Sequence, residues 1–417
     1  MLRDVGLLLS VKYLSILLSM LTGLSQVYIF TKLIAPEDLA WLFTVSGAAA
    51  FLSLFDFGFG KPLYVALRKK FVNNDDMSRV YRASFSILFC FFLLSNVFFV
   101  AAFSVVSSQL EKISTLSFLL FTVSSGLNIS VGLMKHVFYA VDKYLLFDLH
   151  DLVRRIINFA SLIFFFYWQD FFSFACFQLC ALAISIFLLI FQIKQPLCLK
   201  ANVFELKPFK ASAFKNLGFS FNELFIYSGG YIAFKISSHP LEFLKFVLWS
   251  KVYGIVVVFI RALTDVELHR VSREYMAEPS LGRSKQLVWR VIVISVLLAL
   301  LASTFLFVFG EAIIEFVGNG AFVLSDWLIV SLTLMLIASS IQHPSGTVLV
   351  SVVGDYRFLL ASSTAMSIAI FFVYLLARQF SMEKVLLTYS LVFFIGSAVY
   401  FFRSRYCLRT EVAGKHS

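Results

Sequence analysis

Long apolar runs follow one another along almost the whole sequence, separated by short polar segments. They lie at residues 8–32, 39–60, 83–107, 114–138, 152–168, 171–193, 214–236, 241–263, 288–310, 322–345, 358–378 and 384–402. A helix needs roughly 20 predominantly apolar residues to cross a hydrocarbon core of about 30 Å, and these runs have about that length. The pattern predicts an all-α polytopic membrane protein with about 12 transmembrane helices.

Basic residues alternate between the two sets of loops that these spans would create. Clusters such as Arg68-Lys69-Lys70 and Arg403 with Arg405 recur in one set, whereas Lys112 and Lys384 are among the few basic residues in the other. Loops rich in lysine and arginine stay in the cytoplasm. The pattern therefore predicts that both termini are cytoplasmic.

The longest polar stretch within the chain, from Lys194 to Lys215, lies near its middle. Many transporters are built from internal repeats. We therefore predict an N-terminal six-helix half at 1–200, a cytoplasmic linker at 201–215 and a C-terminal six-helix half at 216–417. A weak internal similarity supports two halves, because Lys32 is followed by Pro36 in the first half and Lys235 by Pro240 in the second.

The composition argues against a soluble enzyme. Hydrophobic residues make up 60% of the chain and charged residues 14%, whereas soluble domains have about 25% charged residues. The histidines lack convincing catalytic partners, no phosphate-binding loop is present, and Cys176 with Cys180 is best explained by packing. We expect no catalytic residues, no metal and no cofactor. The net charge of +11 suits an anionic membrane surface, so no nucleic-acid partner is expected.

Three segments break the regular apolar pattern, at 56–62, 228–230 and 343–346. Irregular backbone at membrane depth tends to line protein-enclosed or water-filled cavities. Simple helix termination is the preferred interpretation for 56–62 and for 343–346, which contains His343-Pro344. The pair Gly229-Gly230 either interrupts its span or permits close helix packing.

Charges inside the predicted spans are the candidate functional residues. Lys251 lies near the middle of the run 241–263, where a lysine costs about 2.5–3.5 kcal/mol on insertion scales. It should face a water-filled cavity and bind an anionic substrate or an acidic partner. Glu223 is the candidate for ion coupling. Lys32, Lys235, Lys12 and Lys135 lie nearer span ends, where snorkelling to the interface is the preferred interpretation.

Several of these features resemble one family. The segment from Tyr28 to Leu63 contains a Lys32-to-Pro36 turn and the ending Asp56-Phe57-Gly58-Phe59-Gly60, and similar features follow in Tyr231 to Arg273 and in the turn Gly354-Asp355-Tyr356-Arg357. With its hydropathy pattern, the chain resembles the Wzx-type O-antigen flippases of the multidrug/oligosaccharidyl-lipid/polysaccharide (MOP) exporter superfamily. It departs from them at Gly229-Gly230 and Thr264-Asp265, which leaves the ion-coupling site open. The sequence does not distinguish H⁺ from Na⁺ as the coupling ion.

The resemblance implies two six-helix bundles around a central cationic cavity in the bacterial inner membrane. The implied substrate is an undecaprenyl-diphosphate-linked oligosaccharide, with a polymerase and a chain-length regulator as possible partners beside membrane lipid. Candidate substrate-binding residues are then Lys251, Arg261, Lys61, Lys235 and Lys32, and candidate coupling residues are Glu223 and Asp56. The alternatives are a multidrug or metabolite exporter of the same superfamily and an O-antigen polymerase.

Overall fold

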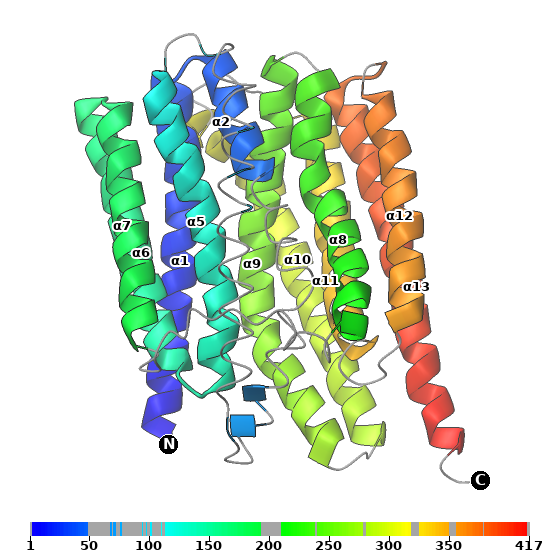
Figure 1. Ribbon diagram of the computed structural model, residues 1–417. Helices are drawn as coiled ribbons and strands as arrows, with labels where there is room; N and C mark the ends of the chain where they lie inside the picture. Colours follow the sequence, from blue (N-terminus) through cyan, green and yellow to red (C-terminus); the bar gives the residue numbers. More distant parts are fainter. Residues whose placement is uncertain are drawn as a thin grey trace. The chain divides into compact units, whose positions relative to one another are not determined.

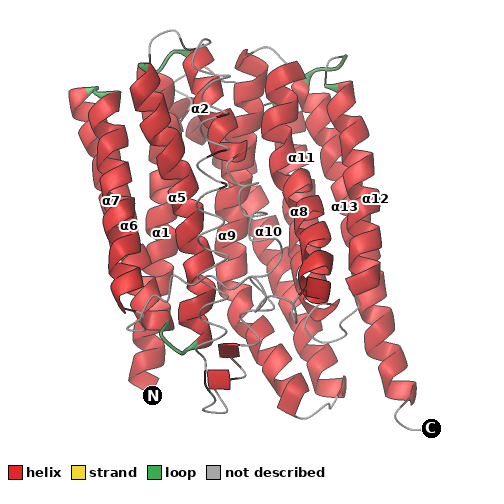
Figure 2. Cartoon of the chain, viewed as in Figure 1, coloured by secondary structure: helices red, strands yellow, loops and turns green. Residues whose placement is uncertain are grey.

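The computed structural model describes residues 2–48, 67–68, 70–71, 113–192, 210–237, 240–277, 281–317, 325–349, 356–377 and 379–414, with single positions at 76, 94, 97, 101 and 110. These residues are almost entirely helical (Figures 1 and 2). The helices are α1 (Leu2–Leu33), α2 (Pro36–Ala48), α5 (Thr115–Ala140), α6 (Tyr144–Trp168), α7 (Phe171–Gln192), α8 (Lys210–Ser237), α9 (Pro240–Ala277), α10 (Leu281–Val317), α11 (Asp326–Val348), α12 (Tyr356–Leu376) and α13 (Met382–Gly414).

Among the described helices, 7 are long and apolar enough to cross a membrane: α1, α7 and α9 to α13. Several helices extend beyond the apolar runs seen in the sequence. The helix α6 begins at Tyr144 rather than at 152, and α9 continues to Ala277 rather than ending at 263. Hydropathy locates the apolar part of a helix, whereas its polar ends continue with the same backbone geometry.

Local capping explains where several helices begin and end. Pro36 opens α2, followed by Glu37 and Asp38 in the first turn, where proline needs no N–H partner and acids favour the positive end of the helix. The Ser114 side chain accepts a hydrogen bond from Ser117 N–H at the start of α5. Gln169 ends α6 in the left-handed conformation, with φ of 55°.

Two predicted breaks are absent from the helices. The expectation that 343–346 ends a span is wrong, because α11 continues through Pro344 to Val348. The alternative that Gly229-Gly230 interrupts its span is also wrong, because α8 is continuous and both glycines are buried, as helix packing requires. The predicted break at 56–62 lies outside the described residues.

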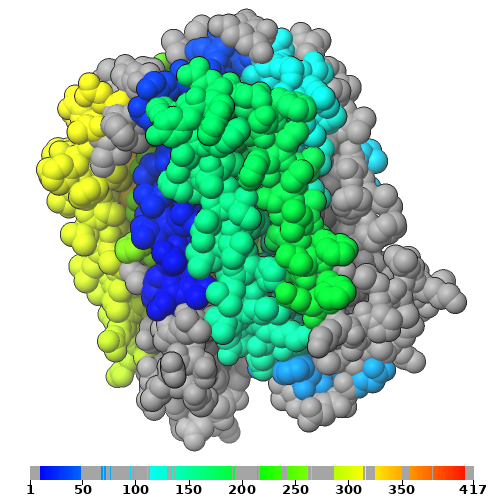
Figure 3. Space-filling view, turned by 90° about the vertical axis from the view of Figure 1, so that its left-hand side faces the viewer, coloured from blue at the N-terminus to red at the C-terminus, as the bar shows by residue number. Residues whose placement is uncertain are grey.

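The chain divides into two compact units, Met1–Ile232 and Ala233–Ser417. In the first unit, α1, α6 and α7 lie side by side (Figure 3). Phe30 on α1 is fully buried at the centre of an aromatic cluster. Its ring centroid lies 5.8 Å from that of Phe165 and 5.7 Å from that of Phe174, both at nearly perpendicular angles. Such edge-to-face pairs contribute beyond simple burial, so this cluster holds α1 against α6 and α7.

In the second unit, α11 packs against α9, α10 and α13. An aromatic column on α9 fixes which face of that helix is packed. The Trp249 and Tyr253 rings stack at 5.7 Å, and the Trp249 indole N–H donates a hydrogen bond to the Ser331 hydroxyl at 2.9 Å. Trp249 also meets the Tyr389 ring edge-on at 6.0 Å. These contacts set the rotation of α9 within its unit.

The aromatic cluster around Phe30 yields a stability prediction. Phe30→Ala would leave a cavity among the surrounding rings, and such truncations typically cost about 3–5 kcal/mol. We therefore expect a clear fall in the thermal unfolding midpoint of the detergent-purified protein, with Phe30→Leu falling less.

Leu14→Ala is the matched control, because Leu14 on the same helix is 53% exposed and its truncation opens no cavity. Equal unfolding midpoints for Phe30→Ala and Leu14→Ala would show that the cluster does not carry the packing of the first unit.

Candidate functional site

Lys251 occupies the middle of the apolar window Glu242–Arg261 of α9. The buried aromatic face of this helix carries Trp249 and Tyr253, and the 3.6-residue period places position 251 on the opposite side. The Lys251 side chain is partly buried. A Cβ added to Gly254, on the same side one turn later, would meet open space. The helix therefore presents its mid-window cation on the side opposite its aromatic column.

Arg261 lies at the end of the same window and lines a small cavity between α9, α10 and α11. The cavity measures about 10 Å³, which is room for about one water molecule. Its other polar lining residues are Thr264, Ser295, Ser339, Ser340 and His343. The Tyr253 hydroxyl hydrogen-bonds to Ser339, so the aromatic column ends at this cavity. Pro344 also lines the cavity. The segment 343–346 therefore adjoins a cavity, although α11 continues through it.

The other predicted site residues are distributed along the chain. Lys235 is partly buried in the last turn of α8, and Glu223 is partly buried on the same helix. Lys32 is exposed near the end of α1, with its Nζ 5.1 Å from the Phe166 ring centroid, as expected for a snorkelling lysine. Lys61 and Asp56 lie outside the described residues. Of the predicted substrate-binding residues, Lys251 and Arg261 lie on the same helix, α9.

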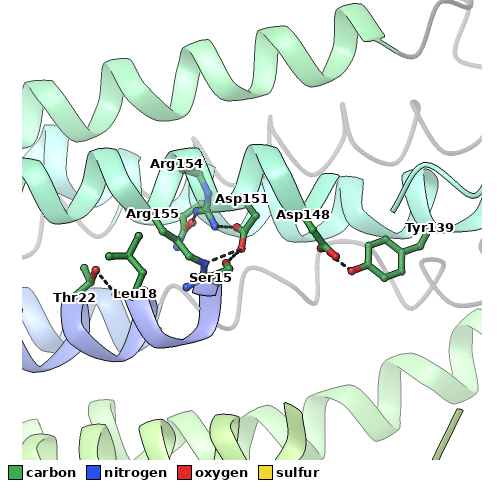
Figure 4. A network of polar contacts seen from close by, with 9 residues as sticks. Ser15, Leu18, Thr22, Tyr139, Asp148, Asp151, Arg154 and Arg155 are labelled. Atoms are coloured by element: carbon green, nitrogen blue, oxygen red, sulfur yellow. Dashed lines mark hydrogen bonds and ion pairs between the residues drawn. The ribbon is translucent and has the colours of Figure 1, made fainter. Parts of the chain in front are cut away.

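A second polar cluster, which the sequence reasoning did not identify, joins α1, α5 and α6 in the first unit (Figure 4). Asp151 lies at its centre. Its Oδ2 accepts hydrogen bonds from the Ser15 hydroxyl at 3.0 Å and from Arg155 Nε at 2.7 Å. Its Oδ1 accepts from the Arg154 guanidinium, which also donates to the Asn128 side-chain oxygen. One carboxylate thus connects two arginines and ties three helices together.

The two arginines control the charge state of Asp151, which precedes the predicted span 152–168. Burial opposes its ionisation, but the Arg154 and Arg155 guanidinium groups and their hydrogen bonds outweigh burial and lower the pKa of Asp151 to about 2. The carboxylate is therefore ionised at neutral pH. In this state it offsets part of the cost of two arginines near the membrane.

Asp148 lies one turn earlier on α6 and bridges to α5. Its Oδ1 accepts a hydrogen bond from the Tyr139 hydroxyl at 2.7 Å. Burial raises the pKa of Asp148 above its ordinary value, although the Tyr139 hydrogen bond and the nearby Lys135 and Lys12 charges act in the opposite direction. The Lys135 Nζ also lies 5.0 Å from the Tyr139 ring centroid. These lysines, predicted to snorkel, therefore also act on a buried acid.

The spacing of this cluster was present in the sequence. Asp148, Asp151, Arg154 and Arg155 are three or four residues apart, the separation at which side chains on one helix meet. Hydropathy placed the start of this helix at 152, which left Asp148 and Asp151 outside the predicted span. Among the described residues, no group of three or more His, Cys, Asp or Glu side chains is placed to hold a metal ion.

The Asp151 cluster yields a second stability prediction. Asp151→Asn would leave Arg154 and Arg155 without their shared counter-charge, and removing one partner of a buried ion pair costs about 3–5 kcal/mol. Because the folded-state pKa is lowered, the contribution of Asp151 is fully present above its ordinary value of 3.8 and is lost as the pH falls through about 2. Thermal unfolding across this pH range should show the difference between the two proteins shrinking toward acid.

Asp142→Asn serves as the control, because Asp142 pairs with Arg68 at 2.6 Å and both side chains are more than one-third exposed. Such surface pairs contribute about 0–1 kcal/mol. If the two variants lost equal stability at neutral pH, the Asp151 cluster would be no more than a surface contact.

Comparison with known proteins identifies the fold. No protein-family model and no curated protein sequence matches the chain. Solved structures do match over nearly its full length. An inward-facing multidrug resistance MATE family transporter of the MOP superfamily superposes with a TM-score of 0.70 at 12% identity, covering 97% of this chain and 98% of that one.

Two further structures agree. A Vibrio cholerae MATE transporter gives a TM-score of 0.67 at 14% identity, covering 97% of each chain. A MOP superfamily transporter from Pyrococcus furiosus gives 0.64 at 11% identity, covering 97% of this chain and 95% of that one. These proteins are transporters rather than enzymes. The prediction of an all-α polytopic membrane protein is confirmed, and the chain has the fold of the MOP superfamily transporters.

Proposed function

We propose that this chain is a flippase of the bacterial inner membrane. It moves undecaprenyl-diphosphate-linked oligosaccharide, the O-antigen repeat unit, from the inner to the outer leaflet by ion-coupled alternating access of its two units. The transporter fold supports a transport function, and the resemblance from Tyr28 to Leu63 supports this substrate class.

The placement of Lys251 is the observation that carries the proposal. A diphosphate cannot enter hydrocarbon unaided, and a cation in the middle of an apolar helix window can neutralise it. Arg261, ten residues further along α9, would add a second positive charge, acting through its field rather than by direct contact because the cavity it lines has room for about one water molecule. The prenyl tail would meanwhile remain in lipid. Glu223 and Asp56 remain the candidates for ion coupling.

A multidrug or metabolite exporter is the second candidate, and the comparisons give it specific support. The structural neighbours include multidrug resistance transporters. The Pyrococcus furiosus protein is described as having a binding pocket of reverse polarity that suggests a different function. Pocket polarity is thus the feature used there to distinguish function. The cationic residues on α9 favour an anionic substrate over the cationic drugs that an acidic pocket would bind.

Substitution of Lys251 tests the binding role. Lys251→Ala removes the charge from the middle of α9, so surface polysaccharide is expected to disappear while the amount of protein in the membrane stays unchanged. Lys251→Arg, which keeps the charge, should retain part of the export. Polysaccharide on gels and protein level by immunoblot provide the two readouts.

Lys245→Ala is a matched control on the same helix, because Lys245 already pairs with Glu242 at 2.7 Å. Export should remain normal in this variant. Normal export in Lys251→Ala would refute the proposed role of Lys251.

A strain that lacks the chain distinguishes the candidate functions. Loss of the polymeric lipopolysaccharide ladder, with lipid-linked single units trapped facing the cytoplasm, is expected of a flippase. Single units that reach the outer surface but stay unpolymerised would indicate the polymerase instead. An unchanged ladder would overturn the flippase proposal and favour the drug exporter.

A further inference from the structure

A groove of about 270 Å³ lies between α10 and α13 in the second unit. Its apolar base is part of a packed core cluster. Val288, Ile292 and Leu408 line the groove and are each buried, together with Val348 of α11, in one hydrophobic cluster. The base of the groove is therefore formed by packed side chains. Its volume suits a short length of hydrocarbon chain.

Two aromatic side chains that contact each other line the groove. The Trp289 and Phe401 rings lie 6.0 Å apart at 43°, and both line it. Trp289 is 54% exposed. Exposed tryptophans in membrane proteins gather at the level of the lipid headgroups. The groove thus combines an apolar base with a rim suited to the membrane interface.

The apolar windows of the two helices place the groove at the same level. The window of α10 begins at Gln286 and that of α13 ends at Leu408, so the groove lies where both helices leave the apolar region. The loop charges predict that this end faces the cytoplasm. Neighbouring positions on both helices, such as Val293 and Phe402, expose apolar side chains as expected for contact with lipid.

Positive charge marks one end of the groove. Arg405 lines it together with Ser404, and its side chain is exposed. Arg290, adjacent to Trp289, is also exposed. Neither arginine takes part in the salt bridges found between described residues. A guanidinium group binds phosphate oxygens through paired hydrogen bonds, and basic pockets between membrane helices bind anionic headgroups.

We propose that the α10–α13 groove binds an anionic phospholipid of the cytoplasmic leaflet. One acyl chain lies on the base formed by Val288, Ile292 and Leu408, beside the Trp289–Phe401 ring pair, and the phosphate group contacts Arg405. A polyprenyl phosphate has similar chemistry, but phospholipid surrounds the exposed faces of α10 and α13 at all times and at high concentration. The inference does not depend on what the chain transports.

Lipid retention by the purified full-length protein tests this site. The detergent-solubilised protein is equilibrated with mixed micelles of phosphatidylglycerol and phosphatidylcholine, and the lipid retained per protein is measured by mass spectrometry. We expect preferential retention of phosphatidylglycerol. Arg405→Gln should weaken its binding about fivefold, as expected for the loss of one basic group near an anionic lipid, and should abolish the preference. Trp289→Ala should reduce retention of both lipids.

Matched controls separate the groove from general surface effects. Arg357→Gln removes an exposed arginine at the start of α12, and Trp327→Ala removes a tryptophan that is 58% exposed at the start of α11. Neither should change lipid retention. Because Arg405 and Trp289 are also exposed, their substitutions should not prevent folding.

Four outcomes would overturn the proposal. Equal retention of the two lipids by the unaltered protein would exclude headgroup recognition. Unchanged retention of phosphatidylglycerol in Arg405→Gln would show that Arg405 does not bind the headgroup. Displacement of phosphatidylglycerol by undecaprenyl phosphate at equal or lower concentration would make the polyprenyl chain the occupant. Displacement by inorganic phosphate alone would show that the apolar groove contributes nothing. None of these results would bear on the proposed transport function, which is tested separately.

Discussion

A peptide group inside a bilayer finds no water, so each helix must satisfy its own polar groups, and this constraint determines how the chain carries polar residues through its apolar windows. Serine and threonine hydroxyls meet it locally by donating to the carbonyl one turn back. Thr22 donates to Leu18 (Figure 4) and Ser339 to Met335, at 2.7 and 2.8 Å. Helices can therefore place hydroxyls toward a cavity without losing their backbone pairing.

Ionised groups cannot be satisfied in this local way, and the two units treat them differently. In the first unit, Asp151 neutralises Arg154 and Arg155 and uses Ser15 to bind α1, so the charges hold helices together. In the second unit, Lys251 lies opposite the packed aromatic column of α9, near the open space beside Gly254. In the first arrangement, the charges stabilise helix packing. The second places a lysine in the middle of an apolar window.

Hydropathy and loop charge predicted the fold class because both follow from the cost of polar groups in lipid, which acts on each segment separately. They failed where a second helix decides the outcome. Gly229-Gly230 was open to interpretation as a break until the continuous α8 showed both glycines buried. The cluster around Asp151 needs Ser15 and Asn128 from other helices, and no spacing within α6 predicts those partners. Lys251 could be identified because the free-energy cost of a lysine in the middle of a membrane helix follows from its position in the sequence alone.

Pro344 shows how a local rule and a tertiary environment combine. Proline lacks an N–H, so the Ser340 carbonyl loses its usual partner, and an isolated helix would be expected to end there. The helix α11 nevertheless continues to Val348, packed against α9, α10 and α13. The defect lies beside the small polar cavity lined by Ser340, His343 and Arg261. Irregular backbone is tolerated at membrane depth where a polar cavity adjoins it, so packing preserves the helix while the cavity accommodates its missing hydrogen bond.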